Sequence, residues 1–178
     1  MLLHKMNRIL KHLTWKGLII LDLARYVNII NAVIVWAVVF IVIKPKRIKE
    51  LLPIAVLSAL ILFVFEMFLH GLDLAMFNNP LLPIAGTPFF HLVWGAGSGL
   101  IFVYFMKEEF SKKIFVILIF ALITGVFGFI SEKVGNHSHL GKFNDLYNFA
   151  FDYVTLVFLI WIAEGLFMRR IYPNALEK

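Results

Sequence analysis

The sequence predicts an all-α integral membrane bundle of about five transmembrane helices, preceded by an amphipathic helix. Hydrophobic residues make up 61% of the 178 residues and charged residues 16%, whereas typical soluble domains have about 45–50% and about 25%. A soluble chain of this length has too high a surface-to-volume ratio to bury so much apolar surface. The composition therefore excludes a soluble globular enzyme and a disordered tail. Because the chain has no cysteine, it also excludes a secreted disulfide scaffold.

The expected spans are stretches with few charged residues, each close to the roughly 20 apolar residues that cross a bilayer. They cover residues 26–43, 51–70, 89–106, 114–131 and 148–168. These runs are too long and too continuous for barrel strands, and a helix is the only open-ended element that satisfies its own backbone in hydrocarbon. The sequence thus predicts a five-helix transmembrane domain over residues 26–170 and a short C-terminal tail over residues 171–178.

The first 25 residues have a different pattern from the rest. Apolar residues recur there at helical spacing, alongside basic residues at Lys5, Arg8, Lys11 and Lys16. Residues 1–25 are therefore predicted to form an amphipathic helix at the membrane surface. Because a long apolar run begins only after Arg25 and no small-residue cleavage site is evident, a removed signal peptide is not expected.

The basic residues also predict an orientation and a location. With five spans, placing the N-terminus outside and the C-terminus inside puts ten basic residues inside and seven outside. This is the arrangement that the positive-inside rule favours. The chain is expected in the cell membrane as a multi-pass protein, with the lipid bilayer as its first partner.

Polar residues gather near one membrane face. The spans place the segments 71–88 and 132–147 on the same side, and charged residues within or beside a span are costly, so they are candidates for function. Glu66, His70 and Asp73 recur at helical spacing and are expected to share one helix face. The candidate metal ligands on this side are Glu66, His70, Asp73, His91, Glu132, His137 and His139. Imidazole and carboxylate together suit Zn²⁺ or a similar divalent ion.

The same residues have two other interpretations. In one, Glu66 and His70 pair with each other or with a backbone carbonyl, while His137 and His139 are solvated loop residues. In the other, Glu66 and Asp152 belong to a proton or cation path, with His70 responding to pH near neutrality.

Small residues predict which helices pack closely. Gly95 and Gly99 form a small-xxx-small face in the third span, and Thr124 and Gly128 offer a similar face in the fourth. Such faces allow helix backbones to approach each other in a membrane. The third and fourth helices are therefore expected at the centre of the bundle.

The order of these features resembles a family of small, uncharacterised multi-span membrane proteins of spore-forming Firmicutes. The features are, in chain order, a basic loop leading to a Leu-Pro helix start (Lys46 to Pro53), Glu66 late in that helix, the run Phe129-Ile130-Ser131-Glu132, and Tyr147-Asn148-Phe149 with Tyr153 opening the last span. Lys133 and Leu146 stand where those relatives often have Pro and Trp. The resemblance covers roughly residues 45–165 and implies a membrane topology and a bacterial origin, with no activity to carry over.

Three functions follow as expectations. The first is an interaction or structural protein that acts through lipid, a protein partner or a second copy of itself, with no role in nucleic-acid binding. The second is a metal-binding protein or metalloenzyme that uses the histidines and carboxylates of the polar face. The third is a proton- or cation-coupled transporter. No catalytic motif is evident, so no catalytic residue is assigned, and enzymatic activity is left open.

Overall fold

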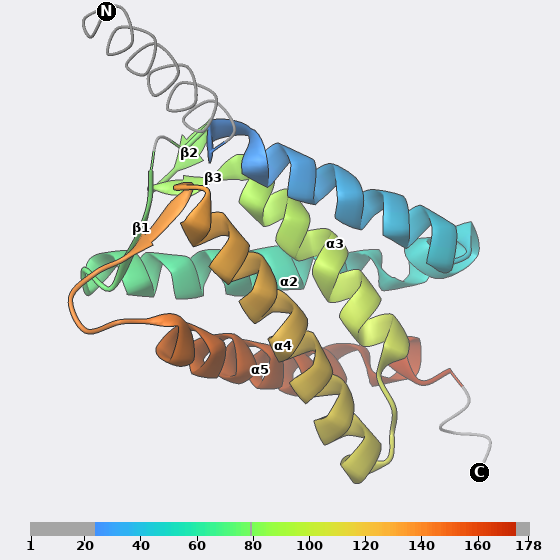
Figure 1. The fold of residues 1–178 in the computed structure, drawn as a ribbon. Helices are drawn as coiled ribbons and strands as arrows, with labels where there is room; N and C mark the ends of the chain where they lie inside the picture. The colour runs from blue at the N-terminus through green and yellow to red at the C-terminus, as the bar shows by residue number, and fades with distance from the viewer. Residues whose placement is uncertain (1–23, 79, 174–178) are drawn as a thin grey trace, which may run out of the picture.

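The computed structural model of the chain describes residues 24–78 and 80–173 (Figure 1). Within these ranges the chain forms five helices and four short strands. The helices are Ala24–Val42, α2 (Pro45–Gly71), α3 (Phe89–Phe105), α4 (Phe110–Lys133) and α5 (Asp145–Ile171). The predicted amphipathic helix falls almost entirely on residues 1–23, and most of the predicted tail on residues 174–178, so both lie outside the described residues.

Four of these helices are long and apolar enough to cross a membrane, and α3 is a shorter apolar helix of 17 residues. Only 11% to 28% of the residues in the apolar windows of the four long helices are buried within the chain. Large apolar side chains are exposed on them instead, including Phe40, Phe115 and Trp161. Helices that are apolar on their exposed sides need lipid around them. The chain is therefore a multi-span membrane protein, which confirms this part of the prediction.

Helices α2, α4 and α5 extend beyond the predicted spans at both ends, because polar residues there continue the helical backbone. Helix α2 begins at Pro45 rather than near residue 51, with proline in the first turn, where its missing N–H is not needed. Helix α5 begins at Asp145 rather than near residue 148.

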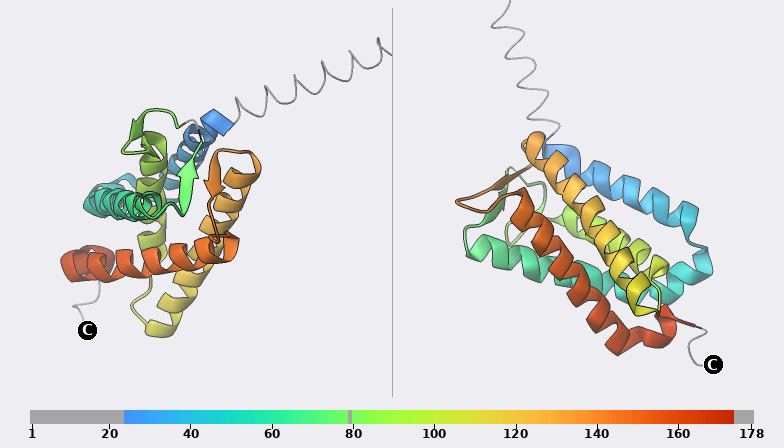
Figure 2. Two further views of the ribbon diagram at one scale, coloured as in Figure 1. Left: turned by 90° about the vertical axis from the view of Figure 1, so that its left-hand side faces the viewer. Right: turned by 60° about the horizontal axis from the view of Figure 1, so that its bottom comes forward.

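The strands are the main departure from an all-α prediction. Strand β1 (Ala75–Phe77) pairs antiparallel with β4 (His137–His139), so that Phe77 lies opposite His137. Strands β2 (Pro83–Ile84) and β3 (Thr87–Pro88) form a hairpin. The left panel of Figure 2 shows the green β1 beside the orange β4. The segments that contain β1 and β4 were predicted on one membrane face. Their backbone N–H and C=O groups are not part of a helix, so they pair with each other by hydrogen bonds across the two strands.

Helix α3 lies at the centre of the bundle, as predicted. A Cβ atom at Gly95 would overlap Leu62 of α2, and one at Gly97 would overlap Val35 of the first described helix. The Trp36 indole of that helix donates to the Val93 carbonyl of α3 over 2.9 Å. Glycines therefore let α3 touch two neighbouring helices at backbone distance.

Helix α4, in contrast, lies at the periphery, and the prediction of a central position was wrong. Ile117 and Ala121 are its only fully buried residues. The Thr124 hydroxyl donates to carbonyls of its own helix. A Cβ atom at Gly128 would meet the Asn148 amide of α5, so the small residues of α4 serve a contact with one neighbour.

A charged cluster joins α4 to the C-terminal end of α5 at the opposite end of the bundle. Glu164 accepts hydrogen bonds from the Lys113 ammonium over 2.5 Å and from the Tyr172 hydroxyl over 2.7 Å. The Lys113 and Glu164 side chains are only 19% and 24% exposed. Partial burial and the nearby Glu164 carboxylate raise the pKa of Tyr172 above its usual range, so the phenol stays protonated and remains a donor.

Replacing Glu164 with glutamine should lower the free energy of unfolding by roughly 1–3 kcal/mol, because hydrogen bonds to charged groups in partly buried positions are worth more than neutral ones. Thermal unfolding in detergent measures this effect. The control is Glu109→Gln, which removes a fully exposed carboxylate paired with Lys112 and should change little, since water screens such pairs. Equal effects of the two substitutions would contradict the prediction.

Candidate functional site

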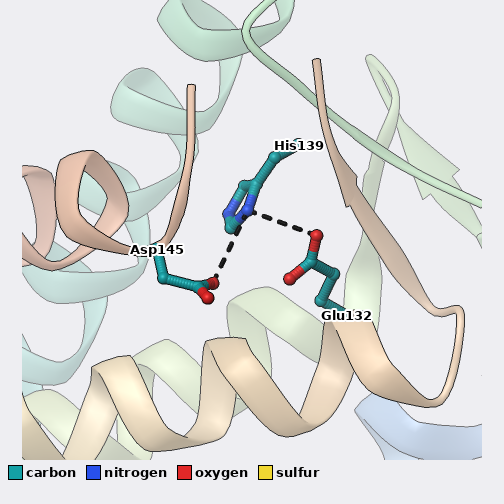
Figure 3. A group of neighbouring side chains, drawn as sticks. All are labelled: Glu132, His139 and Asp145. Carbon is teal, nitrogen blue, oxygen red and sulfur yellow. Dashed lines mark ion pairs between the residues drawn. The ribbon is translucent and has the colours of Figure 1, made fainter. Parts of the chain in front are cut away.

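One continuous segment, residues 132–145, brings together three side chains that can ligate a metal (Figure 3). Glu132 lies in the last turn of α4, which ends at Lys133. The chain then turns at Gly135 with φ +77°, a backbone conformation that glycine adopts without steric cost. After this turn the chain enters β4, whose last residue is His139.

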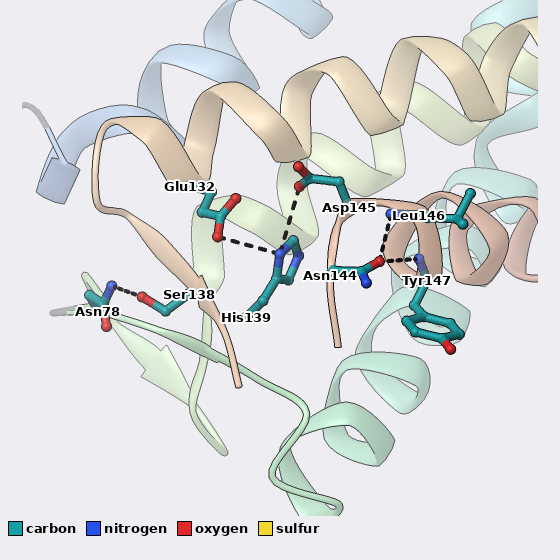
Figure 4. A network of polar contacts seen from close by, with 8 residues as sticks. All are labelled: Asn78, Glu132, Ser138, His139, Asn144, Asp145, Leu146 and Tyr147. Atoms are coloured by element: carbon teal, nitrogen blue, oxygen red, sulfur yellow. Dashed lines mark hydrogen bonds and ion pairs between the residues drawn. The ribbon is translucent and has the colours of Figure 1, made fainter. Parts of the chain in front are cut away.

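Pairing with β1 sets the direction of the β4 side chains. Side chains alternate along a strand, so His137 and His139 point to one side and Ser138 to the other. Asn78, which follows β1, donates through Nδ2 to the Ser138 hydroxyl over 2.7 Å (Figure 4). This contact anchors the outward side of β4 and leaves both histidines facing the bundle.

The start of α5 positions the third side chain. Asn144 caps this helix, because its Oδ1 accepts from the backbone N–H groups of Leu146 and Tyr147 over 3.0 and 3.2 Å (Figure 4). Asp145 is then the first residue of α5. The partial positive charge of a helix N-terminus stabilises a carboxylate there.

Two of the distances in this group are close to those between the ligands of one metal ion. His139 Nδ1 lies 3.4 Å from Glu132 Oε1 and 3.7 Å from Asp145 Oδ1, and the three ligand atoms lie within 4.8 Å of one another. Both separations are longer than the typical N–H···O range of about 2.7–3.2 Å. In a tetrahedral Zn²⁺ site each ligand atom lies about 2.0–2.1 Å from the ion, so two ligand atoms are about 3.3–3.4 Å apart.

The exposure of the three side chains also suits a bound ion that keeps a water ligand. The His139 side chain is 6% exposed, that of Glu132 28% and that of Asp145 54%. The buried imidazole is held by packing against Phe143 and His137. Its Nε2 atom is buried without a hydrogen-bond partner in the described part of the chain, which leaves Nδ1, the nitrogen nearest the two carboxylates, as the ligand atom. Three protein ligands and one open position are the arrangement of many zinc sites that bind water.

The other predicted ligands do not converge on this group. Glu66 pairs with His91, whose Nε2 lies 3.2 Å from Glu66 Oε1, rather than with His70. Phe77 separates the histidines, with ring centroids 6.0 Å from His70 and 4.9 Å from His91. Among residues 24–78 and 80–173, Glu132, His139 and Asp145 form the one group of three or more potential ligands whose atoms lie this close together.

Asp73 and His137 also differ from the predicted pattern. Asp73 follows the end of α2 in an exposed turn, with φ 50°, so it does not share a helix face with Glu66 and His70. His137 is 8% exposed and is not a solvated loop residue. Burial lowers its pKa to about 4, which keeps the ring uncharged at neutral pH.

Beneath β4 lies a polar cavity of about 70 Å³. Its polar lining comes from the first described helix, α2, α3, α4, β4 and α5. It includes Asn28, Asn31, Glu66, His91, His137 and Asp152. The two candidates for an ion path, Glu66 and Asp152, therefore line one cavity, although they come from different helices.

Asn136 holds this face of the bundle together, a role that no pattern in the sequence indicates. It is fully buried, and its Oδ1 accepts from Asn28 Nδ2 over 3.2 Å and from the Ser131 hydroxyl over 2.9 Å. Its Nδ2 donates to the Ala24 carbonyl over 2.7 Å. Asn136 thereby joins the first described helix to the end of α4 and to the start of β4. A single asparagine in a loop has no periodic signature that could indicate such contacts.

Asp145 was likewise absent from the predicted ligands. The signal available for it was the asparagine before it, since Asn is a preferred N-cap and places the next residue at the start of a helix.

Comparisons of the chain with protein-family models, with curated proteins and with solved structures each found no match. The resemblance to the Firmicutes family therefore stays a prediction, and the structure itself supports the assignment of the chain as a multi-span membrane protein.

Proposed function

We propose that this multi-span protein binds one divalent metal ion, of which Zn²⁺ is the best fit, at the polar face of the cell membrane through Glu132, His139 and Asp145. The observation that carries the proposal is the separation of 3.4 and 3.7 Å between His139 Nδ1 and two carboxylate oxygens. One ion can satisfy all three atoms at once, whereas hydrogen bonds of that length are weak.

Electrostatics supports the same conclusion. Two carboxylates close to one imidazole repel each other, and a divalent cation between them removes this repulsion. The mixed nitrogen and oxygen ligand set suits Zn²⁺ better than Ca²⁺ or Mg²⁺, which prefer oxygen alone. The alternative of an interaction protein has no comparable set of contacts in its favour and stays a prediction.

Metal analysis of the purified protein tests the proposal. The protein would be purified in detergent on an affinity tag without histidine, stripped with chelator and titrated with Zn²⁺ in a calorimeter. We expect one Zn²⁺ per chain. His139→Ala should weaken binding by about 100-fold or more, since even residues that only support a ligand contribute about 10–100-fold. Acidification should release the ion, because protons compete for the same ligand atoms.

Two matched variants separate this site from the other candidates. Asp145→Asn should weaken Zn²⁺ binding, whereas Asp73→Asn removes an exposed carboxylate of the same face and should not. His70→Ala should also retain binding, because His70 packs against Phe77 and Gly86 instead of joining the group. A wild-type protein without stoichiometric Zn²⁺ binding, or a His139→Ala variant with unchanged affinity, would refute the proposal.

A further inference from the structure

Two neighbouring cavities meet at Asp152 of α5. The cavity beneath β4 has a volume of about 70 Å³, and a second one of about 60 Å³ lies deeper in the bundle. Leu62, Trp94, Thr124 and Asp152 line both of them. Asp152 therefore stands where the polar cavity near the membrane face meets a more apolar one inside.

The charges around these cavities do not balance. The titratable groups that line them are Glu66 on α2, His91 on α3, His137 on β4 and Asp152 on α5, while the first described helix and α4 contribute uncharged polar groups. Glu66 is in hydrogen-bond contact with His91 at 3.2 Å. Neither cavity is lined by lysine or arginine within the described residues, and Asp152 has no ion-pair partner there. An ionised carboxylate without a partner inside a span is costly, so a proton or a cation must neutralise it.

Two residues that line the outer cavity carry unpaired nitrogen atoms. Trp94 Nε1 and His137 Nδ1 are both buried without a hydrogen-bond partner in the described residues, and both residues line this cavity. Trp94 is 9% exposed and His137 8%. The indole N–H can only donate, so it needs an acceptor such as a water oxygen, and it would repel a cation placed beside it.

The size of the outer cavity agrees with this interpretation. One water needs roughly 10–15 Å³ of such volume and two to four polar partners. The cavity therefore has room for several waters, and its polar lining supplies their partners. These waters would reach from His137, behind β4, to the carboxylate of Asp152.

We propose that Asp152 is a proton-binding residue within the membrane region, which exchanges protons with the β4 face through water in the outer cavity. A hydronium ion delivered along this water transfers its proton to a carboxylate oxygen of Asp152, leaving water and a neutral carboxylic acid. The reverse step returns the proton to the same water. The Glu66–His91 pair lies beside this route and joins α2 to α3. The inference uses residues other than the metal group, so either can fail without the other.

Infrared difference spectroscopy of the protein in lipid nanodiscs, with chelator present to remove metal, tests the inference. We expect a stretching band of a protonated carboxyl group that titrates with pH and shifts in D₂O. Asp152→Asn should abolish the band, whereas Asp73→Asn should retain it. Asp152→Glu, which keeps the carboxyl group, should restore a band at a shifted frequency and serves if the asparagine variant does not fold. Trp94→Phe should keep the band and slow its exchange in D₂O.

Three results would overturn the inference. A band that persists in Asp152→Asn would belong to another carboxyl group. A band that does not shift in D₂O over hours would show that water does not reach Asp152. A band that appears only after Na⁺ and K⁺ are removed would show that a metal cation, not a proton, neutralises the residue.

Discussion

Replacing Asn136 with alanine should lower the free energy of unfolding by roughly 3–6 kcal/mol. The substitution leaves three groups without their partner, which are Asn28 Nδ2, the Ser131 hydroxyl and the Ala24 carbonyl. Each buried polar group left unpaired costs about 1–3 kcal/mol. The loss can be measured by following helix content while sodium dodecyl sulfate is added to protein in mild detergent micelles.

The matched control is Asn78→Ala on the same face. Asn78 also makes two side-chain hydrogen bonds, to Ser138 and to the Gly135 carbonyl, but it is partly exposed, so water can replace them. This variant should lose about 1 kcal/mol. Asn136→Asp should fall between the two, because it keeps the acceptor oxygen and loses the donor. If Asn136→Ala unfolds at the same detergent composition as Asn78→Ala, the central role of Asn136 is wrong.

The second large effect is expected at Gly99. A Cβ atom there would overlap both Oγ and Cβ of Ser58 on α2, and the Ser58 hydroxyl donates to the Gly95 carbonyl of α3 over 2.9 Å. Gly99→Ala must therefore push the two helices apart and disturb this buried hydrogen bond. We expect a loss of roughly 2–5 kcal/mol from overpacking and from the weakened hydrogen bond, measured by the same unfolding titration.

Gly165→Ala is the matched control for Gly99→Ala. Nothing lies within 4 Å of a Cβ atom at Gly165, so alanine should stabilise α5 by up to about 1 kcal/mol through its higher helix propensity. Adding Ser58→Gly to Gly99→Ala removes the overlapping atoms and should recover part of the loss. A loss that the double variant does not reduce at all would show that the two side chains are not in contact.

The transmembrane helices could be predicted because hydrocarbon imposes strong rules on the sequence. Every span needs a long apolar run and internal hydrogen bonds, so charged residues such as Lys44 and Arg169 mark the ends of the runs within a few positions. Glycines likewise indicated the central position of α3. Thr124 and Gly128 led to the wrong prediction of a central position for α4, because the same small residues also suit a helix that contacts one neighbour and faces lipid.

The site could be predicted only in part because its geometry depends on short loops. That the segments 71–88 and 132–147 share one face follows from the number of spans, and the structure agrees. The pairing of β1 with β4 does not follow, because three-residue strands have no detectable alternation. That pairing turns His139 toward Glu132 and inserts Phe77 between His70 and His91. Helical spacing alone had suggested a partnership of Glu66 with His70, and the contact of Glu66 with His91 depends on how α2 packs against α3.

Helix α3 is shorter than the membrane that its neighbours can cross. Its 17 residues span about 25 Å at 1.5 Å per residue, whereas the hydrocarbon core of a bilayer is about 30 Å thick. Helices α2 and α5 have 27 residues each. The non-helical backbone that adjoins α3 must therefore be shielded from lipid by these longer helices, because unpaired backbone groups are not tolerated in contact with hydrocarbon.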